Sequence, residues 1–155
     1  MKPLIVLRIT SIMTLLLAAG HSLGGLESWS PVGENEVLTA MESFRFDAEG
    51  VTLTYLDLYL GFGFILSVYL FLQAVLLWQL AALAKIEALR IRPLIATFFV
   101  ASLVSAGLSF KFIFAESAVS FAAIAAGLAL ALFAASRNVG AQPSVPADGP
   151  QAARR

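Results

Sequence analysis

The chain has 155 residues, of which 59% are hydrophobic and 13% charged, against about 45–50% (glycine included) and about 25% in a typical soluble domain. Because such a chain lacks the polar surface to enclose itself in water, its composition predicts an integral membrane protein. The formal net charge of zero argues against a nucleic-acid partner, and the absence of cysteine excludes disulfides, thiol catalysis and cysteine-ligated metals.

Four uncharged runs approach the roughly 20 residues that a helix needs to cross a bilayer. We expect transmembrane helices over residues 4–26, 55–84, 93–114 and 117–136. The predicted fold is all-α: an antiparallel bundle of four transmembrane helices, with an extracytoplasmic loop or short amphipathic helix between the first two. The second span is the longest, so it should tilt or project beyond the bilayer.

The first span has a second interpretation. Lys2, the apolar stretch from Ile9 and the small residues that end at Gly20 resemble a signal peptide with its cleavage site. Retention as a helix is favoured, because Arg8 shortens the apolar stretch and the apolar character continues to Leu26.

Residues 27–54 are too long for a tight connection and too short for a domain. Val37, Leu38, Met41 and Phe44 repeat with the spacing of one helical face. This pattern predicts a short amphipathic helix over the outer mouth of the bundle. A loop packed on the helix ends explains the same residues.

Polar side chains gather where the first two spans reach the outer surface. His21 belongs to a polar stripe with Thr10 and Thr14. Asp57 shares a helical face with Gly61, and the Gly61–Gly63 segment would allow close helix approach. We expect His21 and Asp57 to pair, either as a hydrogen bond that fastens the two helices or as a binding or acid–base site. The candidate outer-mouth site contains these residues: His21, Asp57, Tyr59, Glu27 and Glu116. One histidine with scattered carboxylates has no metal-ligand spacing, so neither a metal nor another cofactor is expected.

The last span carries small residues at Ala123, Gly127 and Ala131, four apart. This small-xxx-small pattern brings helix backbones together. It predicts packing inside the same bundle, or contact between copies in a homo-oligomer. No span has a charge near its midpoint, which disfavours a pump, channel or carrier.

Residues 140–155 are rich in proline and glycine, which predicts a disordered tail. Of the 10 Lys and Arg residues, all but Arg45 and Lys111 lie at the N-terminus, in the connection between the second and third spans, or from Arg137 onward. The positive-inside rule therefore predicts a multi-pass inner-membrane protein with both termini in the cytoplasm and the acidic 27–54 segment outside.

Several short motifs together resemble a group of small, uncharacterised bacterial inner-membrane proteins. The motifs are His21–Gly25, Phe44–Asp47, Tyr59–Gly63 and Trp78–Leu80. The resemblance implies a four-helix membrane fold and a bacterial source, and it supplies no catalytic residue.

We therefore predict a non-enzymatic membrane component: a module that binds a lipid or another apolar small molecule, or an accessory subunit. The first alternative is a membrane-embedded enzyme that acts at the outer leaflet through His21 and Asp57. The second is a structural protein that binds a partner through its last span.

Overall fold

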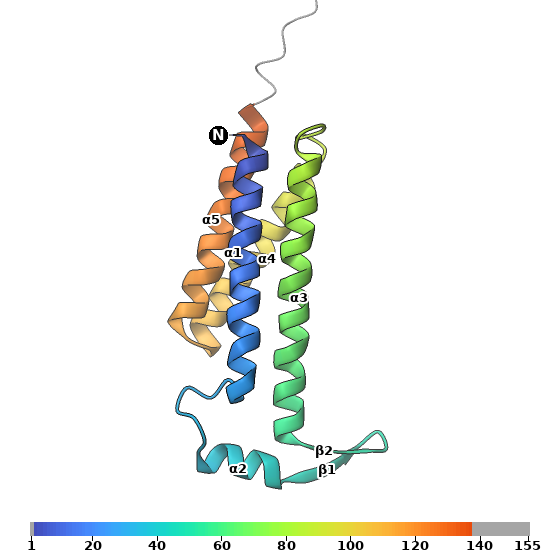
Figure 1. The fold of residues 1–155 in the computed structure, drawn as a ribbon, viewed down its shortest axis with the longest axis vertical. Helices are drawn as coiled ribbons and strands as arrows, with labels where there is room; N and C mark the ends of the chain where they lie inside the picture. The colour runs from blue at the N-terminus through green and yellow to red at the C-terminus, as the bar shows by residue number, and fades with distance from the viewer. Residues whose placement is uncertain (1, 138–155) are drawn as a thin grey trace, which may run out of the picture.

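The computed structural model describes residues 2–137. They form long helices, with a short helix and a β-hairpin at one end of them (Figure 1). The elements in chain order are α1 (Pro3–Gly24), a 3-10 turn η1 (Gly25–Glu27), α2 (Glu36–Ser43), β1 (Arg45–Ala48), β2 (Val51–Thr54), α3 (Tyr55–Leu83), α4 (Arg92–Phe112) and α5 (Ala115–Arg137). The predicted tail, residues 140–155, lies outside the described residues.

Four of these helices, α1, α3, α4 and α5, are long and apolar enough to cross a membrane, with mean hydropathy between 1.8 and 2.3. Their bounds agree with the predicted spans to within a few residues, which confirms the prediction of four long apolar helices. Most large apolar side chains on α3 and α4 are exposed. In water such a surface would be unfavourable, at about 25 cal/mol per Å² of apolar area.

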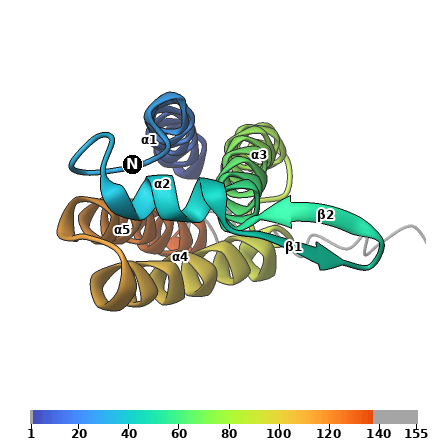
Figure 2. The same ribbon diagram turned by 90° about the horizontal axis from the view of Figure 1, so that it is seen from below.

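The four long helices pack in the order α3, α1, α5, α4, so that α3 and α4, which follow one another in the chain, are not a main packing pair. α1 packs against both α3 and α5, and α4 packs mainly on α5 (Figures 1 and 2). At the end that holds the N-terminus, all four helices share one core, in which Leu7, Leu77, Ile95 and Leu128 are fully buried. The predicted four-helix bundle is therefore formed with α1 and α5, the first and last spans, at its centre.

The contact between α1 and α5 depends on the small residues of the last span. A Cβ atom added at Gly127 would collide with the side chain of Thr10, and Ala131 is fully buried in the shared core. Close approach of the two backbones therefore requires glycine at this position. The pattern packs inside the bundle, and its use between copies of the chain stays a prediction.

Most acidic and most basic side chains of the described residues lie at opposite ends of the bundle, and Figure 1 shows the elements that make up each end. The end that carries α2 and the hairpin is called the acidic end, from Glu27, Glu34, Glu36, Glu42, Asp47 and Glu49. The opposite end is called the basic end, from Lys2, Lys85, Arg90 and Arg92. The assignment of the basic end to the cytoplasm stays a prediction of the positive-inside rule.

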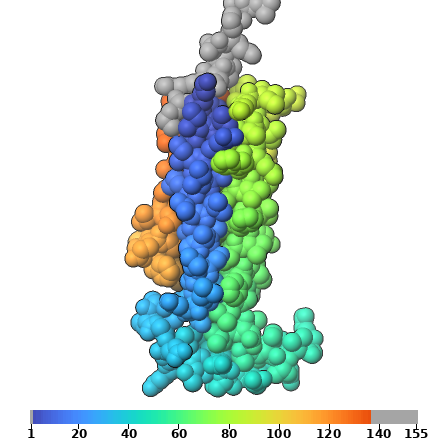
Figure 3. Space-filling model, viewed as in Figure 1, coloured from blue at the N-terminus to red at the C-terminus, as the bar shows by residue number. Residues whose placement is uncertain are grey.

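The 27–54 segment forms a layer across the acidic end (Figures 2 and 3). Its amphipathic helix is present as α2, because the Asn35 side chain accepts hydrogen bonds from the Val37 and Leu38 amides and caps the first turn. The apolar face of α2 is half covered: Leu38 and Met41 are half-buried, whereas Val37 is 67% exposed.

The hairpin that follows α2 was not predicted. Strands β1 and β2 pair antiparallel through a turn at Glu49 and Gly50, whose φ angles of 52° and 85° fit a two-residue hairpin turn. Phe46 of β1 and Phe44 before it both contact the ring of Tyr55, at centroid distances of 4.9 and 5.5 Å.

Candidate functional site

The chain folds back on itself directly after α1 and inserts Trp29 at the acidic end of the α1–α3 interface. Ser28 and Trp29 both adopt left-handed φ angles, 54° and 48°, a conformation that non-glycine residues take at a cost of about 1–3 kcal/mol each. The Trp29 amide donates to the Gly24 carbonyl (2.9 Å), and its indole Nε1 donates to the His21 carbonyl (2.7 Å). These bonds satisfy carbonyls at the end of α1 that would otherwise lack partners.

The indole of Trp29 lies in a slot made by Gly24 at the end of α1, Gly25 in η1 and Gly63 in α3. A Cβ at Gly25 would come within 2.7 Å of the indole, and a Cβ at Gly63 would collide with it outright. Gly61, which was expected to allow the close approach, is exposed and has nothing within 4 Å of its Cβ position. The close contact of the Gly61–Gly63 segment is therefore made by Gly63, with a loop tryptophan.

Three aromatic rings, from His21, Tyr59 and Phe64, surround the Trp29 indole, and the four rings together are named here the Trp29 cluster. Trp29 stacks on His21 at a centroid distance of 5.2 Å and meets Tyr59 and Phe64 edge-on at 6.2 and 5.0 Å. The Tyr59 hydroxyl also donates to the Trp29 carbonyl at 3.4 Å. Such ring pairs contribute about 0.5–1.5 kcal/mol each beyond their burial.

His21, the only histidine, bonds to backbone. Its Nε2 lies 3.2 Å from the Gly63 carbonyl oxygen. Because a carbonyl oxygen only accepts hydrogen bonds, this contact requires a proton on Nε2, which in a neutral imidazole is the Nε2–H tautomer. The imidazole therefore joins α1 to α3 through the backbone of α3.

Asp57 bonds to the residue before its own helix and not to α1. Its carboxylate accepts hydrogen bonds from the Thr54 amide and the Thr54 hydroxyl, both at 2.8 Å, while its own amide donates to the Thr54 hydroxyl at 3.0 Å. This is a capping box at the start of α3. Among residues 2–137, no hydrogen bond joins His21 to Asp57.

The depth of each residue explains why the expected pair is not formed. Asp57 precedes Gly63 by six residues, which places it about 9 Å nearer the acidic end along α3. A second bond between the same helices, from the buried Ser11 hydroxyl to the Ala74 carbonyl (2.7 Å), sets the same register. α3 therefore continues past the end of α1 (Figure 1), and Asp57 lies on the overhang.

The remaining candidates of the outer-mouth site do not join it. Glu27 in η1 and Glu116 in the first turn of α5 are exposed, and neither carboxylate has a side-chain hydrogen bond within residues 2–137. Over the same residues, no group of three or more His, Asp or Glu side chains is placed to hold a metal ion. Of the five candidates, the structure brings His21 and Tyr59 together, on either side of Trp29.

A groove between α1 and α3, named here the α1–α3 groove, begins beside the Trp29 cluster. It has a volume of about 410 Å³ and an almost entirely apolar lining: Leu15, Ala18, Ala19, Ser22, Ser67, Val68 and Phe71. Its two hydroxyls bond to backbone carbonyls of their own helices, Ser22 to Ala18 (2.7 Å) and Ser67 to Gly63 (3.3 Å). The Gly63 carbonyl thus accepts from the groove and from His21 alike.

Sequence reasoning missed Trp29, which is not among the predicted site residues. Two signals were available: a tryptophan in a polar loop, and glycines at Gly24, Gly25 and Gly63 with no turn to make. Linking them needed the register of α1 against α3, which the sequence pattern does not contain.

No family model, curated protein or solved structure matches this chain. The resemblance to small bacterial inner-membrane proteins therefore stays a prediction, and the function has to be argued from the site itself.

Proposed function

We propose that this protein is a non-enzymatic membrane protein that binds a lipid acyl chain in the α1–α3 groove. The observation that carries the proposal is the chemistry of the groove. Its lining is apolar, and its only two side-chain hydroxyls already donate to backbone carbonyls. A polar ligand would lose hydrogen bonds to water there without replacing them, whereas an acyl chain would not.

The position of the groove supports the same ligand. It opens on a surface of exposed apolar side chains, including Leu15, Val68 and Phe71, and with the basic end in the cytoplasm it lies in the outer leaflet. An acyl chain can enter sideways from the bilayer without crossing a polar layer.

The enzyme alternative has less support from the geometry. The Nε2 proton of His21 is engaged with the Gly63 carbonyl, and the Asp57 carboxylate is engaged with Thr54. A catalytic acid–base pair needs its two groups within about 2.6–3.2 Å or bridged by one water. His21 contacts α3 at Gly63, and Asp57 lies almost two helical turns away from Gly63 along α3.

Photo-crosslinking tests the proposal. The full chain is reconstituted with a phosphatidylcholine that carries a photoreactive group in its acyl chain, and labelled peptides are mapped by mass spectrometry. Labels should concentrate on residues 15–22 and 67–71. Ala19→Phe adds a ring to the groove from an exposed position and should reduce labelling there at least several-fold. Ala101→Phe makes the same change at an exposed position of α4, outside the groove, and should leave labelling unchanged.

Uniform labelling of every exposed apolar face would contradict the proposal, since it would describe ordinary bilayer lipid. Equal labelling in the Ala19→Phe and Ala101→Phe variants would contradict it as well. Thermal unfolding of both variants in detergent provides the control for correct folding.

A further inference from the structure

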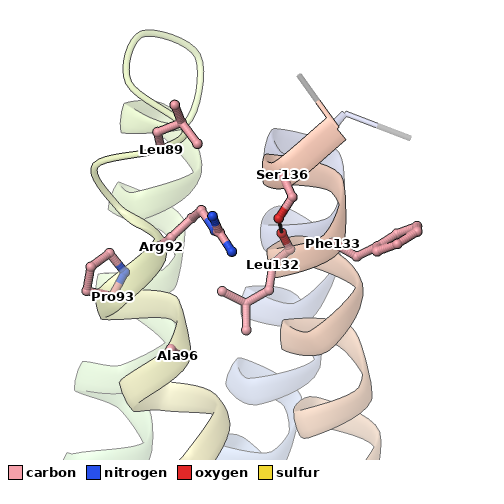
Figure 4. A pocket seen from close by; sticks show the side chains of 7 residues that line it. All are labelled: Leu89, Arg92, Pro93, Ala96, Leu132, Phe133 and Ser136. Carbon is pink, nitrogen blue, oxygen red and sulfur yellow. Dashed lines mark hydrogen bonds between the residues drawn. The ribbon is translucent and has the colours of Figure 1, made fainter. Parts of the chain in front are cut away.

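A second groove lies at the basic end, between α4 and α5, far from the Trp29 cluster (Figure 4). Its volume is about 610 Å³, within the roughly 300–1,000 Å³ of small-molecule sites. Arg92, Pro93 and Ala96 form one wall, and Leu132 and Ser136 form the facing wall. In Figure 4 the guanidinium of Arg92 points across the groove toward α5.

Arg92 brings a charge without a protein partner into this groove. Over residues 2–137, its guanidinium makes no hydrogen bond or ion pair, whereas the neighbouring Arg90 is paired with Glu87 at 3.1 Å. The only other side-chain polar group in the lining, the Ser136 hydroxyl, donates to the Leu132 carbonyl at 2.9 Å. The groove therefore offers one unpaired cation, with planar donors that match a phosphate.

The depth of Arg92 relates this cation to a bilayer. α4 runs from Arg92 to Phe112, a length of about 30 Å at 1.5 Å per residue, which equals the thickness of the hydrocarbon core. Its first residue thus lies where lipid phosphates lie. Ala96, one turn deeper at about 6 Å, and Leu132 line the groove where acyl chains begin.

From this arrangement we propose that the α4–α5 groove binds an anionic phospholipid of the cytoplasmic leaflet. The phosphate accepts hydrogen bonds from the Arg92 guanidinium, and the glycerol and the start of an acyl chain lie against Pro93, Ala96 and Leu132. A free anion would leave the apolar walls exposed, and a zwitterionic lipid would bring its own cation close to the Arg92 guanidinium. Basic pockets between transmembrane helices on the cytoplasmic side are suited to anionic headgroups. The site is separate from the α1–α3 groove, and neither proposal depends on the other.

Native mass spectrometry of the full chain in detergent measures the affinity for phosphatidylglycerol and for phosphatidylcholine with the same acyl chains. The wild-type chain should bind phosphatidylglycerol more tightly. Arg92→Gln should weaken phosphatidylglycerol binding roughly tenfold, the value of one charge-assisted hydrogen-bond contact. It should weaken phosphatidylcholine binding less, because the choline cation already neutralises that phosphate. Arg92→Lys keeps the charge without the planar fork and should fall between the wild-type chain and Arg92→Gln.

Arg90→Gln is the matched control, because it removes the same charge at the same end from a side chain that already has an acidic partner. An equal loss in Arg90→Gln and Arg92→Gln would overturn the proposal, since it would reduce the effect to overall surface charge. Displacement of phosphatidylglycerol by inorganic phosphate alone would assign the groove to a free anion. A dimer that disappears in Arg92→Gln would assign it to a second copy of the chain. Either result would overturn the lipid proposal.

Discussion

The slot that holds Trp29 leads to a sharp prediction at Gly63. A methyl group added there by Gly63→Ala would collide with the indole of Trp29, and the slot leaves that ring no free space because Gly25 lies on its α1 side. Gly61, two residues earlier on the same helix, is exposed with nothing near its Cβ position. Gly61→Ala is therefore the matched control.

The magnitude follows from two opposing effects. Replacing glycine by alanine inside a helix favours folding by about 1 kcal/mol, and both variants gain it. Overpacking costs about 1–3 kcal/mol, and only Gly63→Ala incurs it. The free energy of unfolding of Gly63→Ala should therefore lie about 1–3 kcal/mol below that of Gly61→Ala.

Two measurements check this expectation. Reversible unfolding in detergent, followed by circular dichroism, gives the free energies. The chain has two tryptophans, so in a Trp78→Phe background only Trp29 remains. Its fluorescence emission then reports how far the indole is exposed to water. Gly63→Ala should shift the Trp29 emission to the red as the indole moves toward water. In a Trp29→Ala background the clash is absent, so Gly63→Ala and Gly61→Ala should have the same effect.

Equal stabilities of Gly61→Ala and Gly63→Ala, with unchanged Trp29 emission, would refute the reasoning. That result would mean that Trp29 does not occupy the slot. The register between α1 and α3 would then have to be revised, together with the tautomer assigned to His21.

Three further predictions concern the cap, the topology and the tail. Asp57→Ala should cost about 0.5–2 kcal/mol of stability by loss of the cap, and its effect should add to that of His21→Ala in a double-mutant cycle because the two side chains bond to different partners; a coupling above about 0.5 kcal/mol would contradict this. A reporter fused after Arg90 should be cytoplasmic and one near Asn35 external, so an external signal at Arg90 would overturn the orientation. Truncation after Val139 should leave thermal stability in detergent nearly unchanged, and a large loss would show that the tail packs on the bundle.

The number and extent of the long helices could be predicted from the order of apolar and charged residues along the chain. Uncharged runs of sufficient length determine where a helix can span a bilayer, and this depends only on residues that are contiguous in the chain. The amphipathic helix α2 was predictable for the same reason, since its face repeats within eight residues. The hairpin after it was missed, because two four-residue strands with a Glu–Gly turn give a weak local signal.

The candidate site was predictable only in part. His21 and Tyr59 were placed at the correct end, because height along a helix follows from residue number. The predicted partner of His21, Asp57, was wrong: the residue that His21 contacts, Gly63, lies almost two turns further along α3. The relative height of two residues depends on where α1 ends and on how the two helices are offset. Those quantities are set by contacts between distant residues, such as Ser11 with Ala74.

The sequence by itself determined that this chain has four long apolar helices, that its charge separates along their axis, and that His21 lies near the acidic end. Only the tertiary structure decided that α1 packs between α3 and α5, that Asp57 caps α3, and that Trp29 fills a slot of glycines. The physical reason is that hydrophobicity and charge act on each segment separately. Packing in the slot depends instead on the absence of a Cβ atom at Gly63, which has a meaning only once the indole of Trp29 lies against it.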